Sequence, residues 1–132
     1  MEDSQAENNI PLLTFNSLYN LLREEKKSKK LFKTNEQFYE ALNKYFEDKK
    51  KEIDTLKKEG SDKLRREKLV YRNSQKIAQE LLNLRCMKIA DIAIKDELFG
   101  DDILSKEEIL EEELKFFEET KKAIKKIKPK YI

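Results

Sequence analysis

Carboxylates, lysines and arginines are the side chains of this 132-residue chain that could do chemistry, and together they make up 42% of it. Histidine is absent, which removes the commonest general base and the commonest transition-metal ligand. The only two glycines, Gly60 and Gly100, stand too far apart to form a glycine-rich phosphate loop. Cys86 is the single cysteine and has no histidine to activate it. The sequence therefore predicts a protein that is not an enzyme and that uses no cofactor or metal.

Carboxylate pairs do occur one helical turn apart, as in Glu107 with Glu111 and Glu108 with Glu112. A di-metal centre of the ferritin-like kind also needs Glu-x-x-His motifs from two helices, which a chain without histidine cannot supply. Acids crowd the start of the last predicted helix and lysines crowd its end, an order that complements the helix macrodipole. We interpret the acidic run as a solvated helix N-terminus.

Two basic clusters are candidates for contact with DNA or with a polar partner. One follows the first predicted helix and the other opens the third, and their main members are Lys26, Lys27, Lys30, Arg65, Arg66 and Arg72. Such clusters can bind phosphates. They can equally be solvated faces, because acidic residues are interleaved and the net charge is only +2. Both interpretations stay open on the sequence alone.

The elements that carry these residues are predicted to be helices. Two glycines and two prolines are few, and all four stand beside predicted helices and not inside them. Four helices are expected, beginning after Thr14, Thr34, Asp62 and Ser105. The predicted fold class is all-α, a four-helix bundle-like domain with one long central helix.

Helix ends are predicted from capping chemistry. Thr14 is a plausible N-cap, Thr34 and Ser105 each open a capping-box pattern, and Gly60 can end the second helix in the left-handed conformation. Pro129 stops the last helix. The buried stripe expected on that last helix is Leu110, Leu114, Phe117, Ile124 and Ile127.

The expected domain organisation is a flexible N-terminus over residues 1–13, a helical domain over 14–128 and the start of a linker over 129–132. The N-terminal residues are acidic and polar, without the apolar core of a secretion signal. No apolar run approaches the length of about 20 residues that spans a bilayer. A cytoplasmic protein without membrane contact is therefore expected.

The stretch 62–96 organises the rest of the chain. Its first half is mostly charged, whereas the apolar residues of its second half cover nearly every direction around a helix. Such a helix is either enclosed by several neighbours or used by a partner chain. The core of a four-helix bundle explains part of this belt, and a subunit interface explains the excess. The predicted interface residues are Leu81, Leu82, Leu84, Met87 and Ile94.

The sequence resembles the archaeal GINS family of DNA replication factors. The opening LYNLLREEKKSKKLFK, followed by NEQFYEAL, is similar to the N-terminal part of that family. The later SQKIAQELLNLRCMKIADIAI is similar to its central helix, with Leu82, Arg85, Lys88 and Ile89 in the places of a Leu-x-x-Arg-x-x-Lys-Ile run. The resemblance covers about residues 14–127.

This resemblance implies the helical domain of a GINS subunit whose small β-rich domain is absent from this chain. It implies assembly with other GINS subunits into a homo- or hetero-tetramer that binds the MCM helicase and a RecJ-like protein. The implied function is that of a non-catalytic subunit that activates the replicative helicase, at replication forks on the nucleoid. The alternative is a helical nucleic-acid-binding or regulatory module that acts through the basic helix ends.

Overall fold

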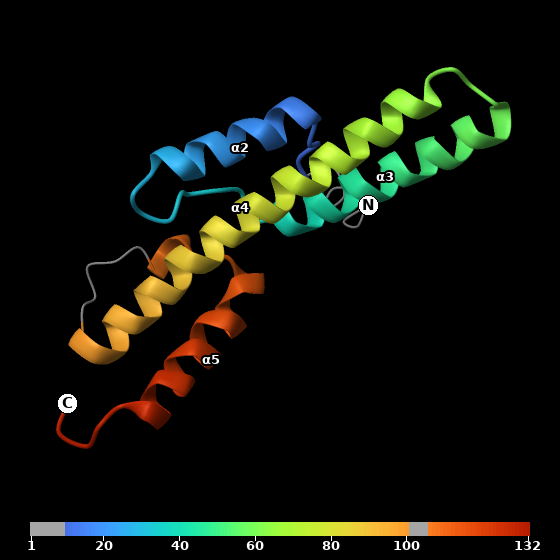
Figure 1. Cartoon of the computed structure of the whole chain (residues 1–132). Helices are drawn as coiled ribbons and strands as arrows, with labels where there is room; N and C mark the ends of the chain where they lie inside the picture. Colours follow the sequence, from blue (N-terminus) through green and yellow to red (C-terminus); the bar gives the residue numbers. More distant parts are fainter. Residues whose placement is uncertain (1–9, 101–105) are drawn as a thin grey trace, which may run out of the picture. The chain divides into compact units, whose positions relative to one another are not determined.

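The structure is a computed structural model, which describes residues 10–100 and 106–132. These residues form four α-helices, one 3₁₀ turn and no strand (Figure 1). The elements are α2 (Phe15–Lys27), α3 (Phe38–Glu59), α4 (Leu64–Phe99), η1 (Lys106–Glu108) and α5 (Glu111–Ile127). The prediction of an all-α, four-helix fold with one long central helix is confirmed, since α4 alone contains 36 residues.

Contacts divide the chain into two compact units. Of the described residues, the first contains 10–23 together with Asn35–Glu80, and the second contains Glu24–Thr34, 81–100 and 106–132. Helix α4 takes part in both, with residues 64–80 in the first unit and 81–99 in the second. The assignment of residues 14–128 to one domain stays a prediction.

In the first unit, α3 packs antiparallel to the first half of α4. Tyr45 lies within 2.7 Å of the Ser74 hydroxyl, and the rings of Phe46 and Tyr71 meet edge to face at 5.6 Å between centroids. Ser74 donates its own proton to the Val70 carbonyl, so Tyr45 is the donor to Ser74. This pairing satisfies the polar group of Ser74, which is fully buried.

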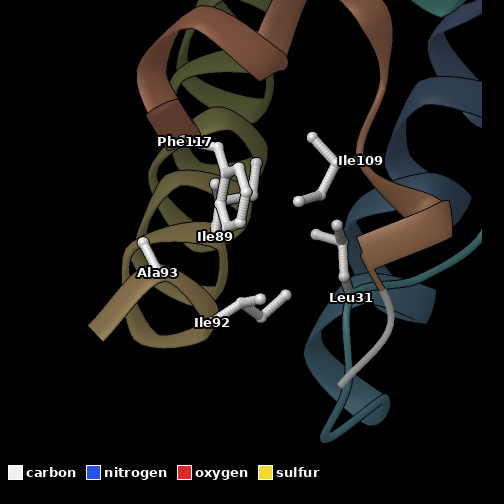
Figure 2. Close-up of a cluster of buried hydrophobic side chains, with 6 residues drawn as sticks. All are labelled: Leu31, Ile89, Ile92, Ala93, Ile109 and Phe117. Carbon is white, nitrogen blue, oxygen red and sulfur yellow. The ribbon is translucent and has the colours of Figure 1, made fainter. Parts of the chain in front are cut away.

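In the second unit, α5 runs parallel to the second half of α4, because contacts pair Arg85 with Glu113 and Asp96 with Lys121. Its apolar core combines α4 and α5 with side chains from the loops that precede α3 and α5. Figure 2 shows the core residues, which are Leu31, Ile89, Ile92, Ala93, Ile109 and Phe117. Ile89 and Ala93 are fully buried. Three chain segments, at Leu31, at residues 89–93 and at residues 109–117, therefore share one small core.

Two of the predicted helix ends are confirmed. The Thr14 side-chain oxygen accepts a hydrogen bond from the Ser17 backbone amide at 3.1 Å, and Ser17 in turn accepts one from the Thr14 amide at 2.7 Å. Gly60 follows α3 with φ of 62° and ψ of 36°, and its amide bonds back to carbonyls of the last turn. A left-handed residue at this place is favourable for glycine because it has no Cβ.

The predicted capping role of Thr34 is wrong. Helix α3 begins at Phe38, and the Asn35 side-chain oxygen accepts from the Gln37 amide at 2.8 Å instead. The physical reason is that the short amide of Asn35 closes a local turn over two residues, which competes with a helix start at Thr34.

The fourth helix also begins later than predicted. Ser105 lies outside the described residues, Lys106–Glu108 forms a 3₁₀ turn, and α5 begins at Glu111. The Glu113 carboxylate accepts a hydrogen bond from the Leu110 amide at 2.9 Å, which satisfies a free donor at this helix start.

The predicted stripe of α5 is correct only in part. Leu110 and Phe117 are buried and Ile124 is half-buried, but Leu114 and Ile127 are exposed. Glu113 is buried one residue before Leu114 because it pairs with Arg85, and this pairing sets which face of the helix turns inward.

None of the helices in the described ranges is long and apolar enough to cross a membrane.

Candidate functional site

The predicted interface residues fall into two groups on the second half of α4. Leu81 is buried in the second unit and Leu84 is half-buried. Leu82, Met87 and Ile94 are exposed by 45%, 63% and 40%. Between them lie only uncharged side chains on the same side of the helix, namely Asn83, Cys86 and Ala90. The second half of α4 thus presents an exposed, uncharged face, which we call the α4 apolar face (Leu82, Asn83, Cys86, Met87, Ala90 and Ile94).

The predicted polar contacts are all exposed. Three of them, Lys26, Lys27 and Lys30, lie at or after the end of α2 in the second unit. The other three, Arg65, Arg66 and Arg72, lie on the first half of α4 in the first unit. Arg65 and Arg72 are seven residues apart and therefore share one side of the helix, whereas Arg66 lies on another side. Arg65 and Arg72 thus present their charges on a common side of α4.

A buried ionic cluster occupies the interior of the second unit. The Arg85 Nε donates to Glu113 Oε2 at 2.7 Å, and Arg85 Nη2 donates to Glu113 Oε1 at 2.9 Å, a bidentate pair. Arg85 Nη1 donates to Glu25 Oε1 at 2.8 Å. The remaining guanidinium protons reach the carbonyls of Phe32 and Glu108. All five donors of Arg85 are therefore used, and its side chain is 1% exposed.

Glu25 connects this cluster to Lys88. The Lys88 ammonium donates to Glu25 Oε2 at 2.5 Å and to the backbone carbonyl of Glu25 at 2.6 Å. The carbonyls of Ser28 and Lys30, after the last turn of α2, also lie within hydrogen-bond distance of this ammonium, whose three protons are shared among the four acceptors. Glu25 Oε2 additionally accepts from the Phe32 amide at 3.0 Å. Lys88 thus closes the C-terminal end of α2, where carbonyls lack helical partners.

Electrostatics in the cluster favour the charged state of Arg85. Burial by itself lowers the pKa of Arg85, but the hydrogen bonds and charges of Glu113 and Glu25 outweigh burial and raise that pKa above its ordinary value.

Burial raises the pKa of the half-buried Cys86 thiol above its ordinary value of 9.0, and the nearby charge of Glu113 adds to this effect. The thiol is therefore protonated at neutral pH, the form that is a poor nucleophile.

A second ion-pair group lies nearer the end of α4. Asp96 Oδ1 accepts from Lys106 at 2.6 Å and Asp96 Oδ2 pairs with Lys121 at 2.7 Å. The hydrogen bonds of Lys106 and then of Lys121 lower the pKa of Asp96 below its ordinary value of 3.8. The Asp96 hydrogen bond in turn raises the pKa of Lys121. This aspartate joins α4 to η1 and α5.

Replacement of Asp96 by asparagine is expected to lower the free energy of unfolding by about 1 kcal/mol at neutral pH. Because the folded-state pKa of Asp96 is depressed, its contribution is fully present above the unfolded pKa of about 3.9. It is lost as the pH falls through the folded value. Urea unfolding should therefore show a constant difference between wild type and Asp96→Asn from about pH 5 to 8, and a shrinking difference below about pH 4.

Asp91→Asn is the matched control, because among the described residues Asp91 forms its one ion pair with Lys95, on the exposed surface of the same helix. Its effect should stay within about 0.5 kcal/mol at every pH. A loss for Asp96→Asn that persists undiminished at the most acidic pH would contradict the role of its charge.

The prediction from sequence missed Glu25 and Glu113 as buried residues. A signal for them does exist. Arg85 interrupts the buried series Leu81, Ile89 and Ile92 at helical spacing. Glu25 continues the α2 series Leu18 and Leu22, and Glu113 lies between Leu110 and Phe117 in the same way. Opposite charges placed within apolar stripes of different helices indicate that those helices meet.

Comparison with known proteins adds no assignment: no family model matches the chain, and neither a characterised protein nor a solved structure shows significant similarity to it.

Proposed function

We propose that this chain is a non-catalytic assembly subunit, which joins other subunits through the α4 apolar face. The observation that carries the proposal is the exposure of Leu82, Met87 and Ile94 on one uncharged side of a helix in a protein whose residues are 42% charged. Exposed apolar patches of this kind mark sites of protein contact. The same unit also exposes Leu114 and Phe116 on α5.

The assembly that we propose is a GINS-like complex that binds and activates the MCM helicase in archaeal DNA replication, with a RecJ-like protein as a further partner. Support comes from the sequence resemblance and from the role of two of its residues. Arg85 and Lys88, both part of the resembling run, are the cations of the buried ionic cluster. Through these contacts the run holds together the second unit, which presents the α4 apolar face. The proposed site of action is the cytoplasm, at replication forks.

Copurification tests this proposal. The tagged chain should retain purified archaeal MCM helicase and a second GINS-like subunit, and sedimentation should show an oligomer at micromolar concentration. A Met87→Glu variant should weaken self-association or association with the second subunit at least about 100-fold, because it buries an unpaired charge in the interface. Its circular dichroism and melting temperature should stay close to wild type, since Met87 is exposed.

Leu69→Glu is the matched control. Leu69 is exposed by 55% on the same helix but lies in the first unit, outside the α4 apolar face. It should leave assembly unchanged. A strictly monomeric chain with and without the second subunit would overturn the assembly function. An oligomer that retains no MCM would overturn only the replicative identity of the assembly.

A second candidate function is a nucleic-acid-binding or regulatory module. The observation that favours it is that all six predicted basic contacts are exposed, so their charges can reach a phosphate backbone.

A further inference from the structure

The first half of α4 carries a row of basic residues that is wider than the predicted pair Arg65 and Arg72. Lys68 and Lys76 complete it, so that the four residues follow one another at intervals of three, four and four along the helix. At this spacing their side chains project from one side of α4 over about 16 Å. All four are exposed. We call this set the α4 basic row.

No carboxylate interrupts the α4 basic row. The other exposed side chains between Lys68 and Glu80 on that side are Leu69, Gln75 and Gln79, none of them charged. Glu67 points to α3, where it pairs with Lys49 at 3.6 Å. Within the two described ranges of the chain, none of the four cations forms an ion pair. The row is therefore a local concentration of positive charge, although the whole chain is nearly neutral.

An open groove of about 480 Å³ borders this row in the same unit. Phe15, Asn16 and Tyr19 of α2 line one wall, and Asn73, Lys76 and Ile77 of α4 line the other. Lys76 belongs both to the groove and to the basic row. Tyr19 is 47% exposed, so part of its ring is open to a ligand. The groove thus combines aromatic and apolar surface with two amides and one ammonium.

We propose that this surface binds a single-stranded polynucleotide, with the phosphates along the α4 basic row and a base in the groove against Tyr19. Charge complementarity selects a polyanion for the row. The groove selects an unpaired base, because an aromatic ring offers a stacking face and the Asn16 and Asn73 amides can both donate and accept hydrogen bonds at a base edge. Bases of a duplex are stacked inside it and cannot enter a side groove. This inference deepens the second candidate function and is independent of the assembly function.

Fluorescence anisotropy with the full chain tests the proposal. The probes are a labelled 20-nucleotide DNA strand of mixed sequence, the RNA strand of the same sequence, and the DNA duplex, each titrated at several salt concentrations. A single strand should bind more tightly than the duplex, and the two single-stranded probes identify which polynucleotide is preferred. Four phosphate contacts predict a slope of log affinity against log salt of about −3 for a single strand.

Two variants separate the phosphate contacts from the base contact. Arg72→Gln with Lys76→Gln should make the salt slope shallower by about 1.4, the share of two contacts. Tyr19→Ala should weaken binding about 5- to 100-fold at fixed salt without changing the slope, whereas Tyr19→Phe should bind like wild type. Lys50→Gln with Lys51→Gln is the control: both residues are exposed on α3 of the same unit, among acidic neighbours, and their loss removes the same charge. Circular dichroism should confirm that each variant is folded.

The outcomes are distinct. Absence of binding to every probe at about 50 mM salt overturns both this inference and the second candidate function, and leaves the assembly function untouched. Equal affinity for duplex and single strand, with no effect of Tyr19→Ala, overturns the base-binding groove. An equal effect of the α3 control and the α4 pair assigns binding to general charge, which overturns the proposed surface.

Discussion

Replacement of Arg85 by methionine is expected to lower the free energy of unfolding by about 3–5 kcal/mol, the cost of leaving buried charges without their partner. Arg85 is the common partner of Glu25 and Glu113, and the three side chains are 1%, 1% and 5% exposed. Methionine keeps much of the apolar stem but removes all five donors. Two carboxylates would then lie close together in a nearly dry interior, with the carbonyls of Phe32 and Glu108 also unpaired.

Chemical unfolding monitored by circular dichroism measures this loss. Arg66→Met is the matched control, because Arg66 is exposed on the same helix and its replacement should change stability by no more than about 0.5 kcal/mol. Glu113→Gln should fall between the two, since an amide keeps the shape but not the charge. A loss below about 1 kcal/mol for Arg85→Met would show that the cluster contributes little to the fold.

Replacement of Lys88 by methionine is expected to have the second largest effect, about 1.5–3 kcal/mol, the range of hydrogen bonds that involve a charged group. The Lys88 ammonium reaches Glu25 and three backbone carbonyls around the end of α2. Its loss removes one of the two cations of Glu25 and reopens the carbonyls of residues 25–30 to solvent. The expected cost is smaller than for Arg85, because Glu25 keeps its bond to Arg85 and the carbonyls of Ser28 and Lys30 can bind water.

Amide hydrogen exchange checks the location of this effect. Exchange should accelerate in residues 24–34 of the Lys88→Met variant, beyond the change expected from global stability alone. Lys27→Met serves as the control, because Lys27 is exposed in the last turn of α2 and its replacement should leave both stability and exchange near wild type. Uniform acceleration over the whole chain would contradict a local role for Lys88.

Helix ends were predictable where a single residue supplies the necessary chemistry. Thr14 offers a side-chain acceptor to a free amide, and Gly60 can adopt a positive φ at no steric cost. The capping pattern at Thr34 did not mark a helix start, and Ser105 lies outside the described residues. Asn35 forms a competing local turn with the Gln37 amide. The Glu113 carboxylate accepts from the Leu110 amide and pairs with Arg85, and these two contacts set the start of α5 later in the chain.

Candidate surfaces were predictable in type but not in detail. The apolar excess of the second half of α4 indicated exposed residues, and Leu82, Met87 and Ile94 are exposed, but only the structure shows that Leu81 is buried. The basic cluster at the start of α4 was recognised from Arg65, Arg66 and Arg72. Helical spacing separates Arg66 from Arg65 and Arg72, whereas the groove formed with Tyr19 depends on how α2 packs against α4 within the first unit.

The helical class of this protein and several of its helix ends follow from the sequence, because helical hydrogen bonds are local and glycine and proline act on the backbone at their own positions. Which charges are buried depends on contacts between segments that are distant in the sequence. Arg85 is 60 residues from Glu25 and 28 from Glu113, so no local pattern contains all three. In a chain this rich in lysine and glutamate, most charged residues stay in water. The few that are enclosed are selected by which helices meet, since a buried charge is tolerated only where its partner arrives from another segment.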